Sequence, residues 1–191
     1  MIASTSSPHL SPEQYLALEE TSAVKHEYID GEIYAMAGAT DAHVTLTGNL
    51  FAALLSHLRG SECRVYFSDM KAQIEAINRY YYPDIMVTCD STDKDEPTFK
   101  RHPILIVEVL SESTTGFDRG DKFADYQTLD SLQEYVLINT HRQRVECFRR
   151  NQKGLWVLQS YSLPESQFEL QSVGFTGELT ALYENVNIQS S

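Results

Sequence analysis

The chain has 191 residues, of which 42% are hydrophobic and 22% charged, as is usual for a globular protein long enough to bury a core. Its net charge of −12 has the wrong sign for general phosphate binding, although the segment HRQRVECFRRNQK could still form a local basic patch. The three cysteines, Cys63, Cys89 and Cys147, are scattered, which indicates reduced thiols and argues against a disulfide framework or a zinc knuckle.

The stretch MIASTSSPHLSPEQ contains neither a basic nor an apolar segment, so no signal peptide is predicted. No apolar run approaches the roughly 18 residues that a membrane span needs. We therefore expect a cytoplasmic protein that does not enter a membrane. Because the sequence shows no internal repeat and no linker, we expect a single domain over residues 1–191.

Two elements are predicted near the amino terminus. SPEQYLALEE indicates a helix in which Ser11 is the N-cap, Pro12 takes the first helical position and Gln14 completes a capping box. KHEYIDGEIYAMAG then consists of two short alternating runs joined by Asp30-Gly31, a pair that suits a type I′ hairpin turn.

A longer helix is predicted from about Asp41 to Arg59, with Gly60 placed to end it. One stripe of this helix is apolar at helical spacing and comprises Leu46, Leu50, Phe51, Leu54 and Leu58. The runs CRVYFSDMKAQI and RYYYPDIMV, separated by EAIN, indicate a second hairpin.

The rest of the chain alternates strand and helix. A polar loop over 89–103 leads to an apolar strand at 104–110, and TTGFDRGDKFADYQTL is a loop entering a helix before the strand EYVLIN. This unit should form a right-handed parallel crossover. RVECFRR and LWVLQSY predict a closing hairpin, and GELTALYENV a short terminal helix. The order predicts an α/β protein with a mixed sheet flanked by helices.

Two carboxylates require an explanation together. Glu108 lies within a strand so apolar that both faces should be buried, where an unpartnered carboxylate costs several kcal/mol. Asp84 follows Pro83, 24 positions earlier. If their strands are neighbours, the two carboxylates converge and repel each other. A divalent cation removes that conflict, and Mg²⁺ is the natural candidate because it prefers oxygen ligands and takes one or two protein carboxylates.

Lys122 is the third member of this set, 14 positions after Glu108 at the start of the following helix. The first turn of a crossover helix lies near the carboxyl end of the strand before it. From there the ammonium can reach a metal-bound water or a phosphate and offset the charge that develops in the transition state.

The ordered set PD, then E-V-L-S-x-S-T, then D-R-G-x-K-x-x-x-Y resembles the PD-(D/E)XK nuclease superfamily. More specifically, it resembles the Uma-type endonuclease family, formerly a domain of unknown function. The stretch EYIDGEIYAMAGAT, with Glu27, and His43 before the helix's NL pair also match that family. The resemblance extends over about 11–161, which we take as the core of the domain.

The resemblance implies a restriction-endonuclease-like fold with an αβββαβ core, preceded by an N-terminal helix and hairpin. It implies Asp84 and Glu108 as catalytic metal ligands, Lys122 as a catalytic residue, and Mg²⁺ as cofactor with Mn²⁺ as a substitute. The lysine that the superfamily carries two residues after the acidic residue is Leu110 here, and the Uma-type branch carries it on the next helix, at Lys122. DNA is the implied partner, and a homodimer the implied assembly.

Structural roles for the three catalytic candidates remain open alternatives. Asp84 can simply begin a strand after a proline. Glu108 and Lys122 can form a buried ion pair without catalysis, which would produce the same sequence pattern. Lys122 can also be a surface lysine paired with Asp118 at i,i+4 spacing.

Three residues are candidates for supporting roles. His43 shares the apolar stripe of its helix and is either a core histidine or a group that points at phosphate or at the metal's neighbours. Glu27 either adds a ligand or caps the hairpin edge. Tyr126 lies four residues after Lys122 on the same helix face, where packing against the lysine stem is its default role.

The sequence therefore predicts a metal-dependent endonuclease that hydrolyses phosphodiester bonds in DNA. The first alternative is a catalytically inactive nuclease fold that binds nucleic acid or serves in assembly, and the net charge of −12 favours it. The second is a metal-dependent hydrolase of another phosphate ester.

Overall fold

The computed structural model describes residues 9–111 and 114–188. Residues 1–8, part of the stretch used to predict that there is no signal peptide, lie outside these ranges, as does Ser113 of the E-V-L-S-x-S-T motif. Within the described ranges, no helix is both long and apolar enough to cross a membrane.

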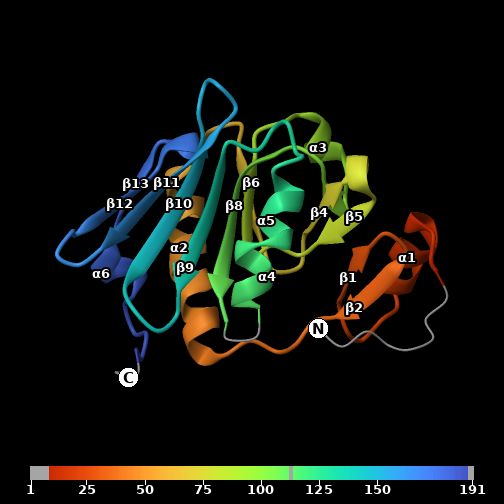
Figure 1. Ribbon diagram of the computed structural model, residues 1–191, viewed down its shortest axis with the longest axis horizontal. Helices are drawn as coiled ribbons and strands as arrows, with labels where there is room; N and C mark the ends of the chain where they lie inside the picture. The colour runs from red at the N-terminus through yellow and green to blue at the C-terminus, as the bar shows by residue number, and fades with distance from the viewer. Residues whose placement is uncertain (1–8, 112–113, 189–191) are drawn as a thin grey trace.

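Within the described residues, the chain forms two large sheets and one small one, with helices packed against them (Figure 1). The helices are α1 (Pro12–Glu19), α2 (Asp41–His57), α3 (Thr92–Asp95), α4 (Thr115–Arg119), α5 (Asp121–Tyr126) and α6 (Leu179–Leu182), with 3₁₀ turns at Glu75–Ile77 and Gln171–Val173. The five-stranded sheet has the order β2 (Glu32–Ala35), β1 (His26–Ile29), β5 (Arg79–Tyr81), β4 (Lys71–Ile74) and β7 (Phe99–Lys100). The six-stranded sheet has the order β11 (Trp156–Ser162), β10 (Arg144–Arg150), β9 (Glu134–Asn139), β8 (Pro103–Leu110), β6 (Ile85–Thr88) and β3 (Arg64–Phe67). The small sheet pairs β12 (Gln167–Leu170) with β13 (Phe175–Glu178).

The predictions for the amino-terminal helix and hairpin are confirmed. Ser11 caps α1 by accepting a hydrogen bond from the Gln14 backbone, while the Gln14 side chain accepts one from Ser11 N at 2.8 Å. Strands β1 and β2 pair antiparallel across Asp30 and Gly31, whose φ angles are 45° and 96°. Two positive φ values are what a type I′ turn requires, so the Asp-Gly pair determines the geometry of the hairpin.

The second hairpin differs from the prediction because it bends from one sheet into another. Its inner part, β4 and β5, pairs antiparallel in the five-stranded sheet, whereas its outer part, β3 and β6, pairs antiparallel in the six-stranded sheet. Both arms break where the backbone cannot continue a strand: Ser68 has a φ of 50° and Pro83 lacks an N–H. Asp84 therefore lies at the point where the chain leaves one sheet and enters the other.

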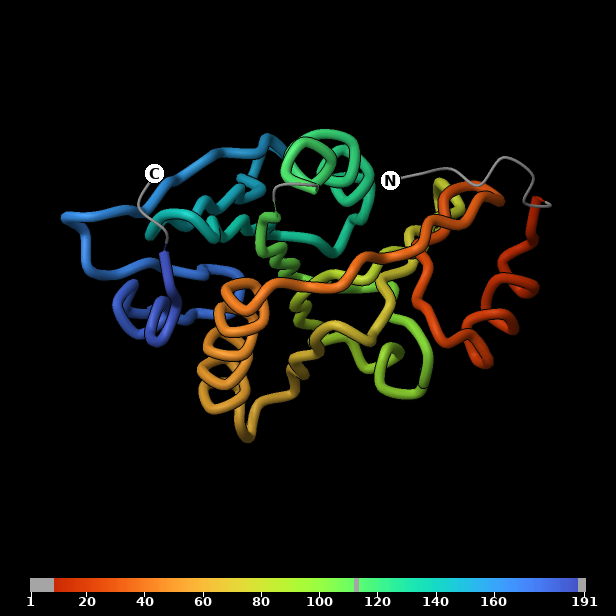
Figure 2. Tube along the Cα trace, turned by 90° about the horizontal axis from the view of Figure 1, so that it is seen from below, coloured from red at the N-terminus to blue at the C-terminus, as the bar shows by residue number. Residues whose placement is uncertain are grey.

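Helices cover both faces of the six-stranded sheet (Figure 2). The predicted apolar stripe of α2 packs against one face, where Leu46, Leu50 and Leu54 join strand residues in the largest core cluster. Phe123 and Tyr126 of α5 pack on the opposite face in a second cluster. Strands β8 and β9 precede and follow α4 and α5 in the chain, and they pair in parallel. The predicted parallel crossover is therefore confirmed.

Four short helices and strands were not predicted. The loop over 89–103 contains α3 and the two-residue strand β7, and the small sheet of β12 and β13 follows the closing hairpin. Each is four residues or fewer, too short for a periodic pattern to be visible in the sequence.

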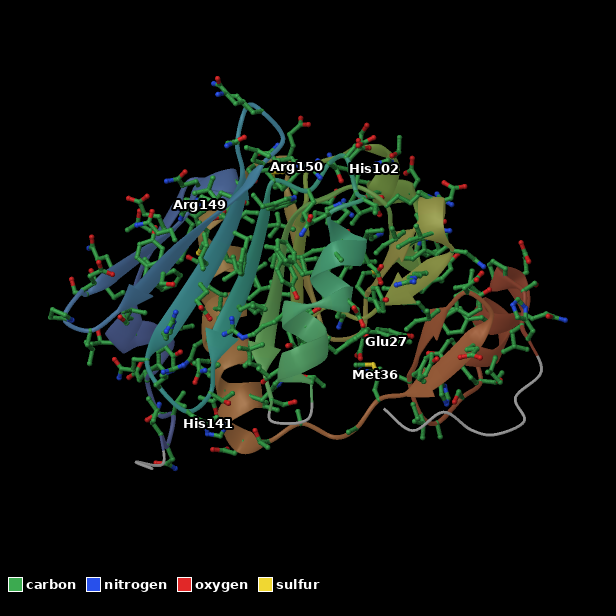
Figure 3. The ribbon with its side chains drawn as sticks, in the orientation of Figure 1. Glu27, Met36, His102, His141, Arg149 and Arg150 are labelled. Atoms are coloured by element: carbon green, nitrogen blue, oxygen red, sulfur yellow. A yellow bond between two sulfur atoms is a disulfide. The ribbon has the colours of Figure 1, made fainter. Side chains whose placement is uncertain are left out.

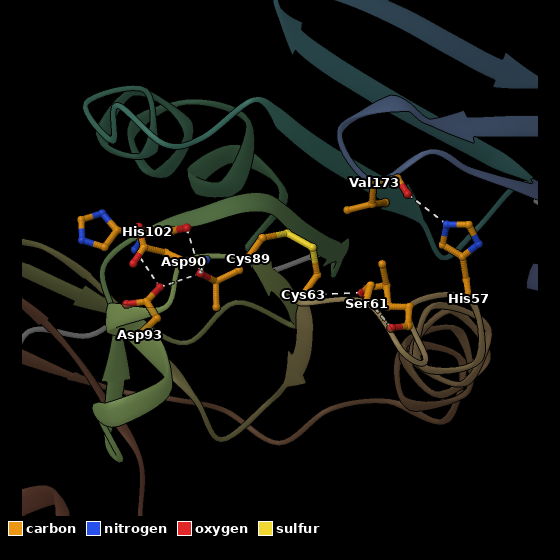
Figure 4. The surroundings of a disulfide bond; sticks show 10 residues. His57, Ser61, Cys63, Cys89, Asp90, Asp93, His102 and Val173 are labelled. Atoms are coloured by element: carbon orange, nitrogen blue, oxygen red, sulfur yellow. Dashed lines mark hydrogen bonds between the residues drawn. A yellow bond between two sulfur atoms is a disulfide. The ribbon is translucent and has the colours of Figure 1, made fainter.

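The prediction of three reduced cysteines is wrong, because Cys63 and Cys89 form a disulfide (Figure 4). Arg64 of β3 pairs with Thr88 of β6, which places the two cysteines opposite each other one position further along the pair. Their separation of 26 residues gives no hint of this until the strands are paired. Cys147 stays free, and burial raises the pKa of its thiol.

Candidate active site

Asp84 and Glu108 lie side by side on neighbouring strands. Ile85 of β6 pairs with Val107 of β8 in an antiparallel register, so the residues just outside that pair face each other. Asp84 N lies 3.4 Å from Glu108 Oε2, to which it donates. Val109 N in turn donates to Asp84 Oδ2 at 2.7 Å. The expected convergence of the two carboxylates is therefore observed.

Lys122 projects from the first turn of α5 into the same place. Its Nζ lies 3.0 Å from Glu108 Oε1, 2.9 Å from Glu27 Oε1 and 3.8 Å from Asp118 Oδ1. The aromatic ring of Tyr81 lies beneath the ammonium at 5.3 Å. Because Lys122 is only 5% exposed, the reading as a surface lysine is wrong. The buried ion pair between Glu108 and Lys122 is present.

The three supporting candidates all reach this cluster. In Figure 3, Glu27 lies between the β1–β2 hairpin and helices α4 and α5, and it also accepts a hydrogen bond from Tyr82 N at 3.4 Å. His43 Nε2 is 3.1 Å from Asp84 Oδ2, so its partner is a site carboxylate. Tyr126 OH donates to Glu108 Oε1 at 3.3 Å, a more specific contact than packing against a lysine stem.

Sequence reasoning assigned Asp118 no role in this site and treated it only as a possible surface partner of Lys122. The structure buries its side chain with Lys122. The available signal was the D-R-G-x-K spacing, since positions i and i+4 lie on one helix face. That Asp118 joins the cluster depends on how α4 and α5 pack, which the spacing alone does not reveal.

The environment perturbs the protonation of most of these groups. Burial raises the pKa of Glu108 well above its usual value, and neighbouring carboxylates add to the rise although Lys122 opposes it. Burial likewise raises the pKa of Asp118. Burial alone would lower the pKa of Lys122, but the surrounding carboxylates, Glu108 first, outweigh it and raise that pKa well above its usual value.

The pKa of His43 likewise depends on burial and on neighbouring carboxylates, which act in opposite directions. Burial would lower the pKa of His43, but the hydrogen bond and charge of Asp84, with the charge of Asp118, outweigh burial and raise it. The cluster thus groups four carboxylates, those of Glu27, Asp84, Glu108 and Asp118, around one lysine and one histidine. Carboxyl groups therefore outnumber cationic groups in this cluster, and the raised pKa values of Glu108 and Asp118 reflect the cost of ionising all of them there.

This donor set fits a hard divalent cation. Across the two described ranges, no group of three or more His, Cys, Asp or Glu side chains is arranged to enclose a metal. Asp84 and Glu108 instead offer two carboxylates at one point, and Mg²⁺ typically takes one or two protein carboxylates and completes its shell with water and substrate phosphate. A bound cation would also favour the ionised form of the carboxyl groups, which outnumber the cationic groups here.

Comparison with solved structures defines the class of fold. The chain is similar to a crystal structure described as "a putative nuclease belonging to DUF820" from Anabaena variabilis ATCC 29413, with a TM-score of 0.74 and 16% sequence identity. The similarity covers 92% of this chain and 98% of that one. The protein therefore has the restriction-endonuclease-like α/β fold that the sequence predicted.

Sequence comparison identifies the family. A family model described as "Uma2: Putative restriction endonuclease" matches residues 12–181, and the chain belongs to that family. Two proteins of Synechocystis sp. (strain ATCC 27184 / PCC 6803 / Kazusa) are each 38% identical to it. "Uncharacterized protein slr1290" aligns over 94% of both chains, and "Uncharacterized protein sll1609" over 78% of this chain and 85% of its own length.

Proposed function

We propose that this protein is a metal-dependent endonuclease that hydrolyses phosphodiester bonds in DNA, with Mg²⁺ as its cofactor and Mn²⁺ as a substitute. The observation that carries the proposal is the convergence of Asp84, Glu108 and Lys122 at one buried point where carboxylates outnumber cations. Membership of the Uma2 family supports the nuclease class.

Asp84 and Glu108 would hold the metal. When bound, the ion lowers the pKa of a coordinated water and stabilises negative charge on the phosphate. The protein fixes both ligands in advance: Val109 N and His43 Nε2 contact Asp84 Oδ2, and Tyr126 OH contacts Glu108 Oε1. Ligands held in this way need little rearrangement when the ion arrives.

Lys122 would act as a charged group. Because its pKa is raised by the surrounding carboxylates, its ammonium stays protonated at neutral pH and donates hydrogen bonds. It would orient the attacking water and offset charge on the phosphate. Glu27 and Asp118 would act through Lys122, since both lie against its ammonium.

Access to the site is uneven, which bears on how a phosphodiester would enter. The side chains of His43 and Asp84 are 17% and 18% exposed, whereas those of Lys122 and Glu108 are 6% and 4% exposed. A substrate would therefore approach from the side of His43 and Asp84, with Lys122 behind the metal ligands.

A second candidate function is a nuclease fold without activity that binds nucleic acid or serves in assembly. The contact of Lys122 with Glu108 at 3.0 Å favours it, because such a pair stabilises a core without any catalysis. The net charge of −12 also favours it, since phosphate contacts need local positive charge.

Cleavage of supercoiled, linear and single-stranded DNA with Mg²⁺ or Mn²⁺ tests the proposal. We expect nicking or linearisation by the wild type and by Glu146→Gln, a buried carboxylate outside the site, and none by Asp84→Asn. A panel of mononucleotides in the same assay separates a nuclease from a hydrolase of small phosphate esters. Absence of cleavage by a wild type that binds the metal would favour the second candidate.

The proposed assembly is a homodimer in which each subunit cuts one strand. Sedimentation equilibrium gives the mass directly, and the ratio of linear to nicked product reports whether two sites act together. A monomer that only nicks supercoiled DNA would contradict the dimer and leave the proposed chemistry intact.

A further inference from the structure

Helix α5 packs against both large sheets. Phe123 faces the six-stranded sheet, where its ring stacks on that of Tyr135 with the centroids 4.7 Å apart. Tyr126 meets Tyr81 of the five-stranded sheet, with the ring centroids 5.5 Å apart. Arg79 lies two residues before Tyr81 on β5, so the two side chains share the sheet face that turns towards α5. Polar groups of β5 are therefore within reach of the helix.

Asp125 of α5 is held by both of these β5 residues. Its Oδ2 forms an ion pair with Arg79 Nη1 and accepts a hydrogen bond from Tyr81 OH at 2.5 Å. Arg79 Nη1 also donates to Tyr81 OH at 3.3 Å. Burial raises the pKa of Tyr81 to about 12, so its hydroxyl is protonated at neutral pH and can donate. We name these three residues the α5–β5 bridge.

The bridge adjoins the lysine of the candidate active site. Asp125 and Lys122 are three residues apart, on one face of α5. Lys122 Nζ contacts both sheets, at 2.9 Å from Glu27 Oε1 of β1 and 3.0 Å from Glu108 Oε1 of β8. The ammonium also lies over the ring of Tyr81, 5.3 Å from its centroid. The hydroxyl of Tyr81 therefore holds Asp125 while its ring faces the ammonium.

The bridge fixes a spacing on which the site depends. Glu27 lies on β1, which is hydrogen-bonded to β5, so a shift of β5 relative to α5 would carry Glu27 away from Lys122. Ring contacts between α5 and β5 tolerate sliding, because the hydrophobic effect is non-directional. A carboxylate held by two donors has a defined geometry, and the side chains of Asp125 and Arg79, at 13% and 26% exposed, are largely shielded from water.

We propose that Asp125 is a positioning residue of the candidate active site: it fixes α5 against β5 and thereby holds the Lys122 ammonium between carboxyl groups of the two sheets. Asp125 acts through Lys122 and not on the reacting atoms. Because a misplacement of about 1 Å can cost about 100-fold in rate, loss of the bridge should slow cleavage by that order. The effect on cleavage rests on the proposed function, whereas the effect on the ammonium does not.

The NMR signal of the Lys122 ammonium tests the proposal without nucleic acid. An ammonium whose protons are donated to buried carboxyl groups exchanges slowly with water, so its signal is observed in protein with isotope-labelled lysine. We expect this signal in the wild type, assigned by its loss in Lys122→Arg. In Asp125→Ala it should shift or disappear. Tyr81→Phe, which removes the bridging hydroxyl but keeps the ring, should shift it less, and it carries the test if Asp125→Ala does not fold.

A second network of carboxylate, arginine and tyrosine supplies the matched controls. On the six-stranded sheet, Arg149 pairs with Glu134 at 2.8 Å and donates to Tyr161 OH at 2.9 Å. Glu134→Ala removes a carboxylate that is more buried than that of the bridge and should leave the ammonium signal in place. Tyr161→Phe is the control for the loss of a bridging hydroxyl. A loss of stability alone should therefore not move the signal.

Cleavage of DNA with Mg²⁺, by variants that are folded at the assay temperature, supplies the second measurement. We expect Asp125→Ala to lower kcat about 100-fold and to leave KM for DNA nearly unchanged, because Lys122 acts on the attacking water. Tyr161→Phe should change neither constant. A role of Asp125 in stability alone would also change neither constant under these conditions.

The outcomes separate this inference from the proposed function. An unchanged Lys122 signal in the folded bridge variants would overturn the proposal, as would an equal shift in the control variants. Absence of the signal from the wild type would also overturn it, because the ammonium would then not be held by its carboxyl groups. A shift confined to the bridge variants, with no cleavage by the wild type, would uphold the positioning role and reject the endonuclease. Cleavage with an unchanged kcat in Asp125→Ala would uphold the endonuclease and reject the inference.

Discussion

The six-stranded sheet carries two buried ionic networks that differ in their balance of charge. On β9 and β10, Glu134 Oε1 accepts a hydrogen bond from Arg149 Nε at 2.8 Å, and Glu146 forms ion pairs with both Arg119 and Arg144. Around Lys122, three carboxyl groups share one ammonium, and Asp84 beside them pairs with His43. The first network is matched or rich in cations, and the second is rich in anions.

The network on β9 and β10 uses several arginines of the basic segment HRQRVECFRRNQK. Arg149 and Arg150, labelled in Figure 3, lie on β10, and Arg150 donates to the backbone carbonyls of Gln127 and Asp130. Arg144 is used by Glu146. Arg144, Arg149 and Arg150 therefore make contacts within the protein, whereas Arg142 and Lys153 of the segment HRQRVECFRRNQK are exposed.

The network around Lys122 is different, because it has fewer cationic groups than carboxyl groups. Burying charged groups is costly unless each finds a partner, and here one ammonium and one imidazole face four carboxyl groups, of which Glu108 and Asp118 have raised pKa values. A buried excess of one sign identifies a place where the fold retains groups for a ligand, whereas a balanced pair needs no further explanation. Each of the following predictions tests this contrast.

The largest effect is expected from removing the central cation. Lys122→Met leaves the surrounding carboxylates without their ammonium and should lower the free energy of unfolding by about 3–5 kcal/mol, as well as abolishing cleavage. Arg149→Met should lower the free energy of unfolding by a similar amount, because it leaves the buried Glu134 without its partner. Urea unfolding with and without Mg²⁺ separates the two networks, because the gain in stability from the ion should be larger in Lys122→Met, which lacks a cation at the site, than in Arg149→Met, whose site is intact.

The metal itself should stabilise the wild type. At a concentration 100 times its dissociation constant, a ligand that binds only the folded state adds about 2.7 kcal/mol. Thermal unfolding should show this gain with Mg²⁺ in the wild type and in Glu146→Gln, and none in Asp84→Asn. A gain that persists in Asp84→Asn would place the ion elsewhere.

A smaller effect is expected at Tyr126. Tyr126→Phe removes the hydroxyl that donates to Glu108 and should reduce the free energy of unfolding by about 1–3 kcal/mol, the cost of leaving a buried acceptor short of a partner. Tyr34→Phe, which removes an exposed hydroxyl bonded to Glu32, should change stability by less than about 0.5 kcal/mol. Chemical denaturation of both variants measures the difference. Equal values would show that the contact to Glu108 contributes nothing.

The smallest effect concerns pH. Because the pKa of His43 is raised in the folded state, its pairing with Asp84 stabilises the fold fully below the unfolded value of about 6.5 and is lost as pH rises through the raised value. In EDTA, the stability difference between the wild type and His43→Gln should therefore be largest at about pH 6 and shrink towards about pH 9. A difference that stays constant with pH would contradict the pairing.

Residues that lie close together in the sequence were sufficient to predict much of the fold. The capping box at Ser11, the Asp30-Gly31 turn and the stripe of α2 each depend on residues within one turn or one hairpin, and all were predicted. Glu108 could be recognised as a site candidate because a carboxylate in a fully apolar strand needs a partner whatever the surrounding fold.

The features that escaped prediction depend on contacts between distant segments. The disulfide of Cys63 with Cys89 follows only from the pairing of β3 with β6. The bend of the second hairpin places Asp84 between two sheets, although both arms read as continuous strands in the sequence. Asp118 joins the cluster because α4 and α5 pack together over β8, and helical spacing alone left it at the surface.

Calorimetric titration of Mn²⁺ into the wild type, Asp84→Asn and Glu146→Gln tests the contrast between the two networks most directly. The anionic cluster predicts saturable binding by the wild type and by Glu146→Gln, and its loss in Asp84→Asn while that variant remains folded. A wild type that binds no ion, or equal binding by Asp84→Asn, would contradict the assignment of the Lys122 cluster as a metal site.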